Sequence, residues 1–446
     1  TLYISLRGDF SMLNIRMPEG ARMIMDKLSE AGIRSWLVGG CVRDMLRHRI
    51  PNDWDIAAGA DPEEIVRALD GLCVILTGIR HGTVTVVAED DCFEVTACRC
   101  DGEYKDMRRP ESVSFTRSIE SDLSRRDFTI NAMAYSQKDG LIDLYSGRAD
   151  LRRGLIRCVG DPNRRFSEDA LRIMRALRFA SELGFEIDPD TVDAALALKE
   201  NLDAVSQERK LSELRRLLLG QSAGEVLIRY QEIFVQIMPE CRALIGFPYC
   251  DGSTEDIWTH CAHSVDRAPK KFNVRLAALL RDIGKPYCRK TGVSDPGHAE
   301  TGARMAEHML RRMKLDNAAL HETVALIANH TVVPEPEECQ IRRALHRLGA
   351  GTLFDLYQLR KCAYDPQAAL DIRQALERVD AAHALTRKIL ERGDCYMLST
   401  LAVNGDDLRE RGYAGPALGA KLDELLMLVI DGKCPNTREA LLGKLI

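Results

Sequence analysis

Two acidic side chains, Asp53 and Asp55, stand two residues apart in the segment "NDWDIA". Because side chains alternate along a β-strand, this spacing predicts that both carboxylates share one face, with Trp54 and Ile56 directed into a core. A pair of adjacent carboxylates is a hard-oxygen site that suits Mg²⁺. A metal held there lowers the pKa of an attacking hydroxyl and stabilises a leaving pyrophosphate. Glu94, in "CFEVTA", is a candidate third carboxylate from a neighbouring strand.

A Gly-Gly turn, Gly39 and Gly40, precedes these acids in "LVGGCVRD". Between a strand and a helix, such a turn lets the backbone approach a phosphate, and the helix start offers free N–H groups to the anion. Taken singly, a Gly-Gly pair and a DxD pair are most often plain turns. Together, in this order and at this spacing, they are a much more specific indication of nucleotidyl transfer.

A second polar pair, Asp169 and Arg172, occurs in "SEDALRIMRALRF", which predicts a helix capped by Ser167. Residues three apart on a helix share a face, and an Asp accepts hydrogen bonds that an Arg donates. This pair matches the amine and ring nitrogen on the pairing edge of cytosine or adenine. It leaves polar groups unpaired against uracil or guanine. From the residues alone, a solvated ion pair within the helix is the commoner outcome.

The hydrophobic pattern divides the chain into a mixed part and a helical part. Up to about residue 150, helices and strands alternate, which predicts a mixed α/β head. From Leu151 onward strand signals almost vanish, and helices follow one another with short Gly or Pro breaks. The expected elements of the head are helices at 20–34, 41–49 and 63–71, and strands at 35–40, 52–58, 83–89, 92–99 and 141–145.

Composition narrows the class of protein. The 446 residues are 45% hydrophobic and 29% charged, and the formal net charge is -5, which argues against a strongly basic nucleic-acid coat. Residues 151–179 nevertheless hold eight Arg against three acids, 8 − 3 = +5, which is enough for a local RNA-binding surface. Fourteen cysteines without a CxxC pair indicate a reducing cytoplasm rather than a disulfide scaffold. No apolar run is long enough to span a membrane, and Thr1 to Asp9 lack the features of a secretory signal.

Continuous similarity to a known family runs from about Trp36 to Leu219. The motifs that carry it are "LVGGCVRDMLRHRIPNDWDIA", "DGEYKDMRRP", "RRDFTINAMAY", "LIDLYSGRADLRRGLIRCVGDPNRRFSEDALRIMRALRFA" and "SQERKLSELRRLL". They resemble the class II nucleotidyltransferases, which comprise CCA-adding enzymes and bacterial poly(A) polymerases. The resemblance implies template-independent addition of CCA to tRNA from CTP and ATP, with Mg²⁺ and no further cofactor. The oligomeric state is left open.

The resemblance also implies an architecture and a set of site residues. It predicts a polymerase-beta-like head at 20–150, a neck at 151–220, a helical body at 221–356 and a helical tail at 357–446, with "GYAGPALGAKL" in the tail helping to grip tRNA. Catalysis and metal binding fall to Asp53 and Asp55, with Glu94 assisting. Asp169 and Arg172 select the base, while Arg209 and Glu213 are expected to form an ion pair that braces the neck. The remaining nucleotide-binding candidates are Gly39, Gly40, Arg43, Arg126, Asp127 (also a cap or ribose acceptor), Asn131, Arg175 and Arg178, with Glu168 less certain.

Related activities remain open at this point. Poly(A) synthesis and CC-only or A-only addition are alternatives within the family. The segment "TGIRHGTVTVV" resembles the CCA-type enzymes, and the stretch from Ala97 to Ser118, expected to be flexible, has the full length that switching from C to A requires. Neither feature decides between the activities.

Residues 258–330 resemble an HD phosphohydrolase domain, through "WTHCAH", "LRDIGKP", "GHAETG" and "ANH". Two alternatives to a nucleotidyltransferase therefore remain. One is a phosphodiesterase with an RNA-binding head, and the other is a non-catalytic RNA-binding protein. The position that should hold the metal-binding His of the HD pair is Arg281, and a guanidinium has no lone pair to give a metal. The sequence predicts that this domain is structural, with Asp282 paired to Arg281, Lys285 or a neighbouring His. The other HD-like residues are His260, His298 and His330.

Overall fold

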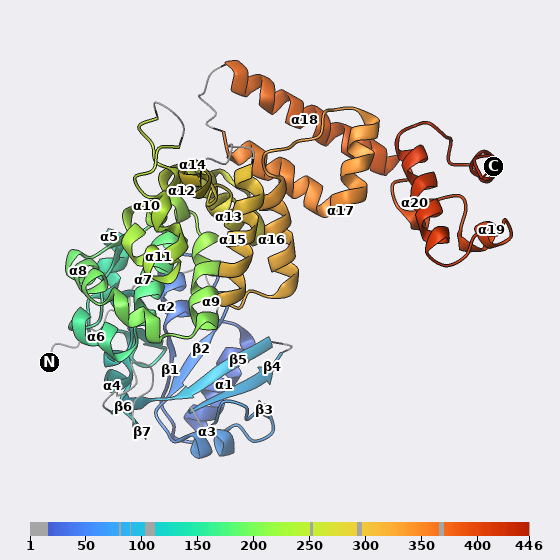
Figure 1. Cartoon of the computed structure of the whole chain (residues 1–446). Coiled ribbons are helices and arrows are strands. Elements are labelled where there is room, and N and C mark those ends of the chain that lie inside the picture. Colours follow the sequence, from blue (N-terminus) through green and yellow to red (C-terminus); the bar gives the residue numbers. More distant parts are fainter. Residues whose placement is uncertain are drawn as a thin grey trace. The chain divides into compact units, whose positions relative to one another are not determined.

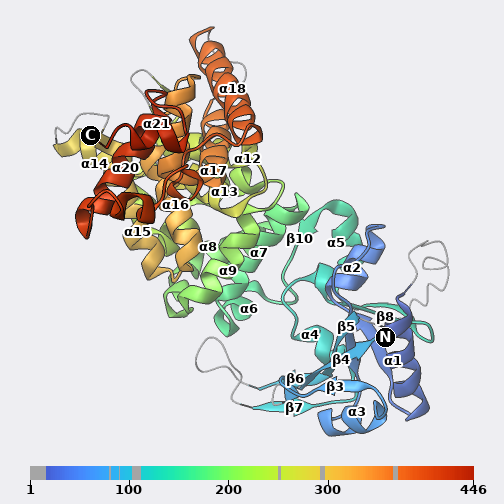
Figure 2. The same ribbon diagram turned by 90° about the vertical axis from the view of Figure 1, so that its right-hand side faces the viewer.

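The computed structural model describes residues 17–79, 82–89, 91–102, 112–249, 253–291, 297–364 and 370–445. Most of the motif "DGEYKDMRRP" lies outside the described residues, as do the start of the chain and part of "TGIRHGTVTVV". The chain forms two compact units. The first runs to Leu217 and includes Glu232–Ile237, and the second contains Leu218–Gln231 and Met238 onward. Figures 1 and 2 show the elements of each unit. Within the described part, no helix is long and apolar enough to cross a membrane.

A seven-stranded sheet, in the order β3-β4-β5-β2-β1-β8-β9, forms the centre of the first unit (Figure 1). Strands β2 and β5 pair in parallel, whereas the pairs β1 with β2, β1 with β8 and β4 with β5 are antiparallel. The predicted mixed head is therefore confirmed. The bounds are α1 (Glu19–Glu30), β1 (Ser35–Val38), α2 (Gly40–Leu46), β2 (Asp55–Ala58), α3 (Pro62–Ala68), β3 (Cys73–Ile75), β4 (Thr83–Ala88), β5 (Asp91–Ala97), β6 (Arg99–Asp101), β7 (Val113–Phe115), α4 (Ile119–Ser124), η2 (Thr129–Asn131), β8 (Met133–Ser136) and β9 (Gly140–Asp143).

Helices follow the sheet within the same unit, and they carry the arginine-rich segment. Two short strands, β10 and β11, pair in parallel among them, which the sequence pattern does not predict. The bounds are α5 (Gly147–Arg153), β10 (Leu155–Ile156), α6 (Pro162–Glu168), α7 (Leu171–Leu183), β11 (Glu186–Ile187), α8 (Pro189–Ala197), η3 (Lys199–Ala204), α9 (Gln207–Leu218) and α11 (Gln231–Ile237).

The two faces of the sheet are covered by different helices. Helix α1 contacts β1, β2, β4 and β5, and it buries Ile24 and Leu28 completely. Trp36 and Val38 alternate with Leu37 along β1, and they pack with Ala57 against Ile119 and Leu123 of α4. The face that carries Ala57 is also the face of Asp55, because the two residues are two apart on β2. The α4 side of the sheet is therefore the side on which a site can form.

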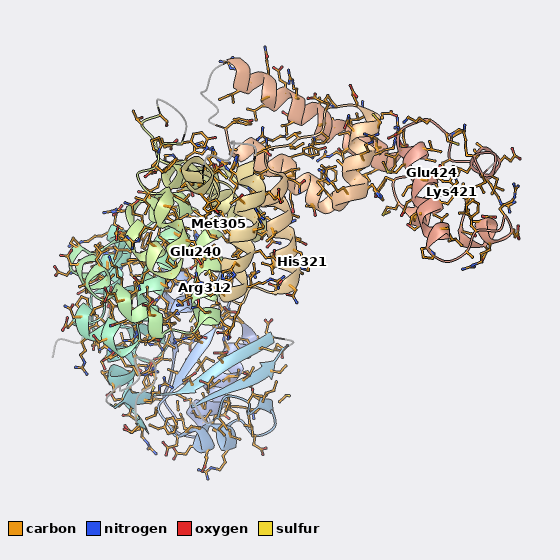
Figure 3. All side chains as sticks on the ribbon, in the orientation of Figure 1. Glu240, Met305, Arg312, His321, Lys421 and Glu424 are labelled. Carbon is orange, nitrogen blue, oxygen red and sulfur yellow. The ribbon has the colours of Figure 1, made fainter. Side chains whose placement is uncertain are left out.

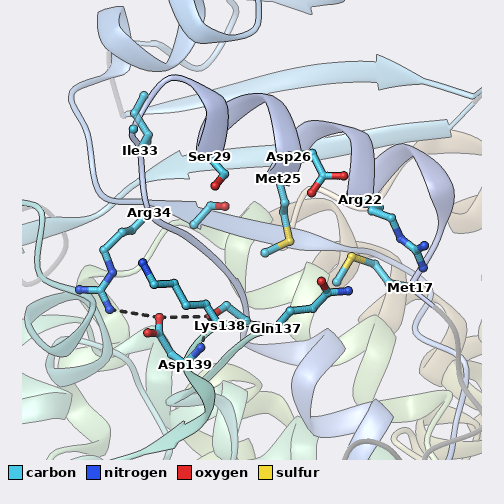
Figure 4. Close-up of a pocket in the computed structure, with 13 residues that line it drawn as sticks. Met17, Arg22, Met25, Asp26, Ser29, Ile33, Arg34, Gln137, Lys138 and Asp139 are labelled. Atoms are coloured by element: carbon cyan, nitrogen blue, oxygen red, sulfur yellow. Dashed lines mark hydrogen bonds and ion pairs between the residues drawn. The ribbon is translucent and has the colours of Figure 1, made fainter.

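A charged contact joins β1 to the turn between β8 and β9. The Trp36 indole donates to the Asp139 carboxylate at 2.8 Å, and Arg34 pairs with the same carboxylate at 3.1 Å. A cavity of about 300 Å³ lies beside this contact, lined also by Met17, Arg22 and Met25 (Figure 4). It shares no residue with the polar cavity of the next section. We therefore assign this cavity no part in the candidate functional site.

The second unit is helical in its described part, as predicted. Helices α12, α13, α16 and α17 pack on one another, and Arg312 of α15 pairs with Glu240 of η4 at 2.8 Å (Figure 3). A separate apolar cluster, which includes Leu408, Leu425 and Ile430, holds the last helices together. The bounds are α10 (Ala223–Arg229), η4 (Pro239–Leu244), α12 (Ile257–Arg267), α13 (Phe272–Leu280), α14 (Lys285–Thr291), α15 (His298–Arg312), α16 (Asn317–Asn329), α17 (Glu338–Cys362), α18 (Leu370–Glu391), η6 (Leu398–Thr400), α19 (Gly405–Arg409), α20 (Pro416–Ile430) and α21 (Arg438–Leu442).

Candidate functional site

A polar cavity of about 580 Å³ in the first unit gathers the residues that the sequence singled out. They come from the sheet and the loop before β2, from α2, from the segment after α4, and from α7 and the break before it. The predicted residues that line it are Gly39, Gly40, Arg43, Asp53, Asp55, Glu94, Arg126, Asp127, Asn131, Asp169, Arg172, Arg175 and Arg178. Phe179, Thr96, Arg125 and Arg209 line it as well.

The carboxylates of Asp55 and Glu94 lie on neighbouring parallel strands, and these two residues are in register. Burial raises the pKa of Asp55, and the nearby Glu94 and Asp53 raise it further, while Arg126 opposes them. A carboxylate held at a raised pKa beside other carboxylates is relieved by a bound cation. The donor set is oxygen, the type that Mg²⁺ prefers, so the residues present fit a divalent metal.

The predicted strand position of Asp53 is wrong. Strand β2 begins at Asp55, and Asp53 lies in the loop before it. Trp54 is correspondingly only half-buried, whereas Ile56 is fully buried. Asp53 and Asp55 still line one cavity, so the loop, rather than the alternation of a strand, brings the two acids together.

Gly39 leaves the space between Asp55 and Arg126 open. Its φ is +73°, in the region that favours glycine, and α2 begins at the next residue. A Cβ at Gly39 would lie 2.8 Å from Nη1 of Arg126 and 3.8 Å from Oδ2 of Asp55. The backbone conformation therefore requires glycine here, and a Cβ would in addition have to displace the end of the Arg126 side chain.

A chain of hydrogen bonds connects α2 to α7 through Asp127. Arg43 donates to Oδ1 of Asn131 at 2.9 Å, and the Asn131 amide donates to Oδ1 of Asp127 at 3.3 Å. The backbone N–H of Phe128 donates to the same oxygen, and Arg175 donates to Oδ2 of Asp127 at 2.7 Å. Burial alone would raise the pKa of Asp127, but Arg175, with smaller contributions from the Phe128 N–H and from Arg172, lowers the pKa to about 2. Asp127 is thus ionised and fully engaged by protein donors.

Arg178 is buried below this network, with 2% of its side chain exposed. Its Nε lies 2.7 Å from Glu213, an ion pair whose angle falls short of a hydrogen bond, and Glu182 is a second partner at 3.7 Å. Its guanidinium stacks on Phe179 at 4.1 Å, and those of Arg43 and Arg175 also lie over this ring. Arg178 therefore supports the cavity rather than presenting its charge to a ligand.

The helix predicted to start at Ser167 is two helices with a break between them. Ser167 lies inside α6, which ends at Glu168, and Asp169 has an extended backbone before α7 begins at Leu171. Asp169 accepts from the backbone N–H of Leu171, the first residue of α7, at 3.1 Å, and the predicted cap at Ser167 is wrong. The prediction that Asp169 and Arg172 share a helix face is therefore wrong, although the two residues still line one cavity.

Hydrogen bonds to other protein groups hold both Asp169 and Arg172 in position. Arg209 donates to Oδ2 of Asp169 at 2.8 Å, and Glu168 accepts from Arg172 at 2.7 Å. Arg172 also donates to the backbone carbonyls of Arg165 and Arg125, each at 3.1 Å. The predicted ion pair between Arg209 and Glu213 is wrong, because each instead pairs with a residue near the cavity. Helical spacing alone does not tell which of two facing helices supplies the partner.

Sequence reasoning missed the support that α4 gives to Arg126. Asp122 is buried and pairs with Arg125 at 2.5 Å and with Arg126 at 3.0 Å. Burial would raise the pKa of Asp122, but the two guanidiniums lower it. The spacing of three and four residues in "DLSRR" was the available signal for these pairs.

In the second unit the HD-like residues form a separate buried group. Nε of Arg281 donates to Asp282 at 3.0 Å and Nζ of Lys285 lies 3.1 Å from the same carboxylate, so the predicted pairing is confirmed. Nε2 of His298 and of His330 lie 3.5 and 3.6 Å from Asp282. Asp282, His298 and His330 are the one group of three metal-ligating side chains within 4.8 Å of one another that the described residues contain. His260 is not part of this group, because its Nδ1 is hydrogen-bonded to Glu255 and its ring stacks on Tyr249.

Comparison with known proteins identifies relatives of both halves of the chain. Residues 35–157 match the poly A polymerase head domain, and residues 184–244 match the probable RNA and SrmB-binding site of polymerase A. A CCA-adding enzyme of Levilactobacillus brevis is 34% identical over 95% of this chain and 96% of its own length. One of Geobacillus stearothermophilus is also 34% identical, over 93% of each chain.

A solved structure gives the same result. The crystal structure of the Bacillus stearothermophilus CCA-adding enzyme in complex with CTP superimposes with a TM-score of 0.70 at 30% identity. The match covers 96% of this chain and 97% of that one. The likeness therefore spans both compact units and is not confined to the head.

We expect Arg175→Met to destabilise the protein by about 1–3 kcal/mol at pH 7, because the variant leaves the buried Asp127 without its partner. The pKa of Asp127 then rises from about 2, so protonation relieves the defect and the deficit shrinks as the pH falls towards 4. Urea unfolding of both proteins at pH 7 and pH 4 measures this difference. Arg164→Met, which removes an exposed partner of Glu168, is the control. Equal losses for the two variants at both pH values would contradict the assigned role of Asp127.

Proposed function

This chain belongs to the family of CCA-adding enzymes, and from that membership we propose that it adds C, C and A to the 3′ end of tRNA, using CTP and ATP. The observation that carries the proposal is the cavity in which the three acids, the guanidiniums and the pair Asp169 and Arg172 meet. Each nucleotide is added when the 3′ hydroxyl of the RNA attacks the α-phosphate of the triphosphate, forming one phosphodiester bond and releasing pyrophosphate.

We propose that Asp53 and Asp55 hold Mg²⁺ and that Glu94 assists from the adjacent strand. The bound metal supplies activation of the 3′ hydroxyl and neutralisation of the leaving pyrophosphate. The raised pKa of Asp55 supports this proposal, because Arg126 alone does not offset the effect of burial and of the neighbouring negative charges on this carboxylate. Gly39 and Gly40 keep the neighbouring space clear, and Arg126 at its edge is positioned to contact the phosphates.

Asp127 has a positioning role in this proposal. Its two oxygens accept three hydrogen bonds, from Phe128, Asn131 and Nε of Arg175, and Nη2 of Arg175 lies 2.5 Å from Oδ2 as an ion pair. A carboxylate offers about four acceptor sites, so a ribose hydroxyl would have to displace one of these donors. We therefore propose that Asp127 fixes Arg175 and Asn131, and that Asn131 in turn orients Arg43.

We propose that Asp169 and Arg172 select the base. Arg172 uses three of its five N–H groups on Glu168, Arg165 and Arg125, which leaves two for a ligand. Each oxygen of Asp169 accepts one described hydrogen bond and keeps a further lone pair. An acceptor and a donor fixed side by side fit the amine and the ring nitrogen of cytosine and adenine, and mismatch uracil and guanine.

The tRNA would be held mainly by phosphate contacts on the neck and the helical tail. Of the arginines at 151–179, Arg175 and Arg178 are occupied by internal ion pairs. Arg152, Arg153 and Arg164 are exposed, so we propose them as the phosphate contacts.

Every cysteine that the structure describes is a free thiol, which supports a reducing compartment, and we place the enzyme in the cytoplasm.

The proposed activity is tested by the product formed on tRNA that lacks its 3′ end. We expect CTP alone to give two added residues, CTP with ATP to give three, and synthesis to stop there, as product lengths on a sequencing gel will show. A tRNA that already ends in CCA is the control. Long tails of A on an unstructured RNA would instead establish poly(A) polymerase activity, the alternative within the family.

Asp55→Asn should lower turnover by about 10³-fold or more, because several kcal/mol of charge stabilisation in the transition state are lost with the metal. The same variant should unfold in EDTA at a Tm no lower than that of the parent, because ionised Asp55 is disfavoured in the metal-free protein. Asp91→Asn, at an exposed position on β5, is the control for both assays. Near-normal turnover of Asp55→Asn in Mg²⁺ would remove Asp55 from the catalytic centre.

Asp169→Ala should admit UTP and GTP, because the acceptor that disfavours a keto oxygen is gone. Losing one polar contact shifts discrimination by about 1–3 kcal/mol, which is tenfold or more. Competition between CTP and UTP in single-nucleotide addition measures the ratio, with Asp190→Ala, an exposed acid of α8, as the control. An unchanged ratio would show that another group selects the base.

A further inference from the structure

A second polar cavity, of about 160 Å³, lies in the helical second unit. It is bounded by the residues that follow α13, by the starts of α14 and α15, and by the ends of α16 and α17. Arg281, Lys285, His298, His330 and Arg360 all line it. These are the HD-like residues together with an arginine from α17 that the HD pattern does not include.

Several N–H groups at this cavity have no hydrogen-bond partner within the described residues. Arg281 is 2% exposed, and only its Nε is used, by Asp282, while Nη1 and Nη2 are buried and unsatisfied. Arg360 donates from Nη1 to the carbonyl of His330 and from Nη2 to Tyr364, but its Nε is also buried and unsatisfied. Leaving a charged donor unsatisfied costs more than leaving a neutral one, so an acceptor is expected at this place.

The charges of the lining side chains specify what kind of acceptor fits. Three cations, Arg281, Lys285 and Arg360, face one carboxylate, Asp282. Both oxygens of that carboxylate are already taken, Oδ2 by Arg281 and Oδ1 by Lys285. Although His298, His330 and Asp282 are close enough to share a metal ion, the adjacent guanidinium and ammonium repel one. Fixed side-chain cations therefore lie beside Asp282, His298 and His330 and disfavour a metal ion there.

We propose that this cavity binds a phosphate group, held by Arg281, Lys285 and Arg360. Guanidiniums and a lysine are the side chains that bind phosphate oxygens in proteins. The cavity is far smaller than the head cavity, at about 160 Å³ against about 580 Å³, so it has room for a phosphate or pyrophosphate group but not for a whole nucleotide. The ligand is either a free anion, such as the pyrophosphate that nucleotide addition releases, or the terminal phosphate of a nucleotide.

The full-length protein should be stabilised by inorganic phosphate, measured as a saturable rise in Tm at constant ionic strength. Arg281→Lys should weaken the apparent affinity at least tenfold, because lysine keeps the charge beside Asp282 but loses the two Nη donors. Arg360→Lys should act in the same direction and serves if Arg281→Lys fails to fold. Arg312→Lys, on α15 of the same unit but not among the residues that line the cavity, should leave the response unchanged.

Parallel titrations with pyrophosphate and AMP distinguish the two sources, since each response must also be lost in Arg281→Lys. Absence of any phosphate response would overturn the proposal and assign the donors to water. A response equal in Arg281→Lys, Arg360→Lys and Arg312→Lys would place the anion elsewhere. Stabilisation by Mn²⁺ or Ni²⁺ without phosphate, lost in His298→Ala, would show that the cavity is a metal site. None of these measurements depends on nucleotide addition.

Discussion

The Asp127 carboxylate holds together the two halves of the candidate active site. It lies between α4 and β8, and it pairs with Arg175 of α7, the helix that contains Arg172 and begins just after Asp169. A buried ion pair is worth most when every lone pair is satisfied, and here both oxygens are. This contact, together with the hydrogen bond from Arg172 to the carbonyl of Arg125, links the acids that we propose to bind metal to the pair that we propose to select the base.

The same pairing explains why an arginine-rich cavity does not repel itself. Arg175 and Arg178 have Asp127 and Glu213 as partners, Arg172 has Glu168, and Arg126 has Asp122. Phe179 lies beneath three of the guanidiniums and limits their movement. The positive groups are thus held in fixed positions before a triphosphate binds. In such a preorganised site, little free energy is needed to orient these groups during the reaction.

Much of this arrangement could be predicted from the sequence, because local patterns fix it. The Gly-Gly turn, the strand around Asp55 and the mixed head followed by helices were all evident. The break between α6 and α7 was not, since "SEDALRIMRALRF" has good helix formers on both sides of Asp169. Two tertiary contacts that stabilise the break, from Arg209 to Asp169 and from Arg172 to the carbonyl of Arg125, join residues 40 and 47 positions apart in the sequence. Periodicity contains no information about such partners.

The central claim is that one cavity brings the metal-binding acids and the base-selecting pair to the same nucleotide. A crystal structure with CTP and Mn²⁺, in which anomalous scattering locates the metal, tests it most directly. We predict a metal within about 2.3 Å of oxygens of Asp53 and Asp55, and the cytosine edge hydrogen-bonded to Asp169 and Arg172. A metal bound instead by Asp282, His298 and His330, or a cytosine that does not contact Asp169 and Arg172, would contradict the account.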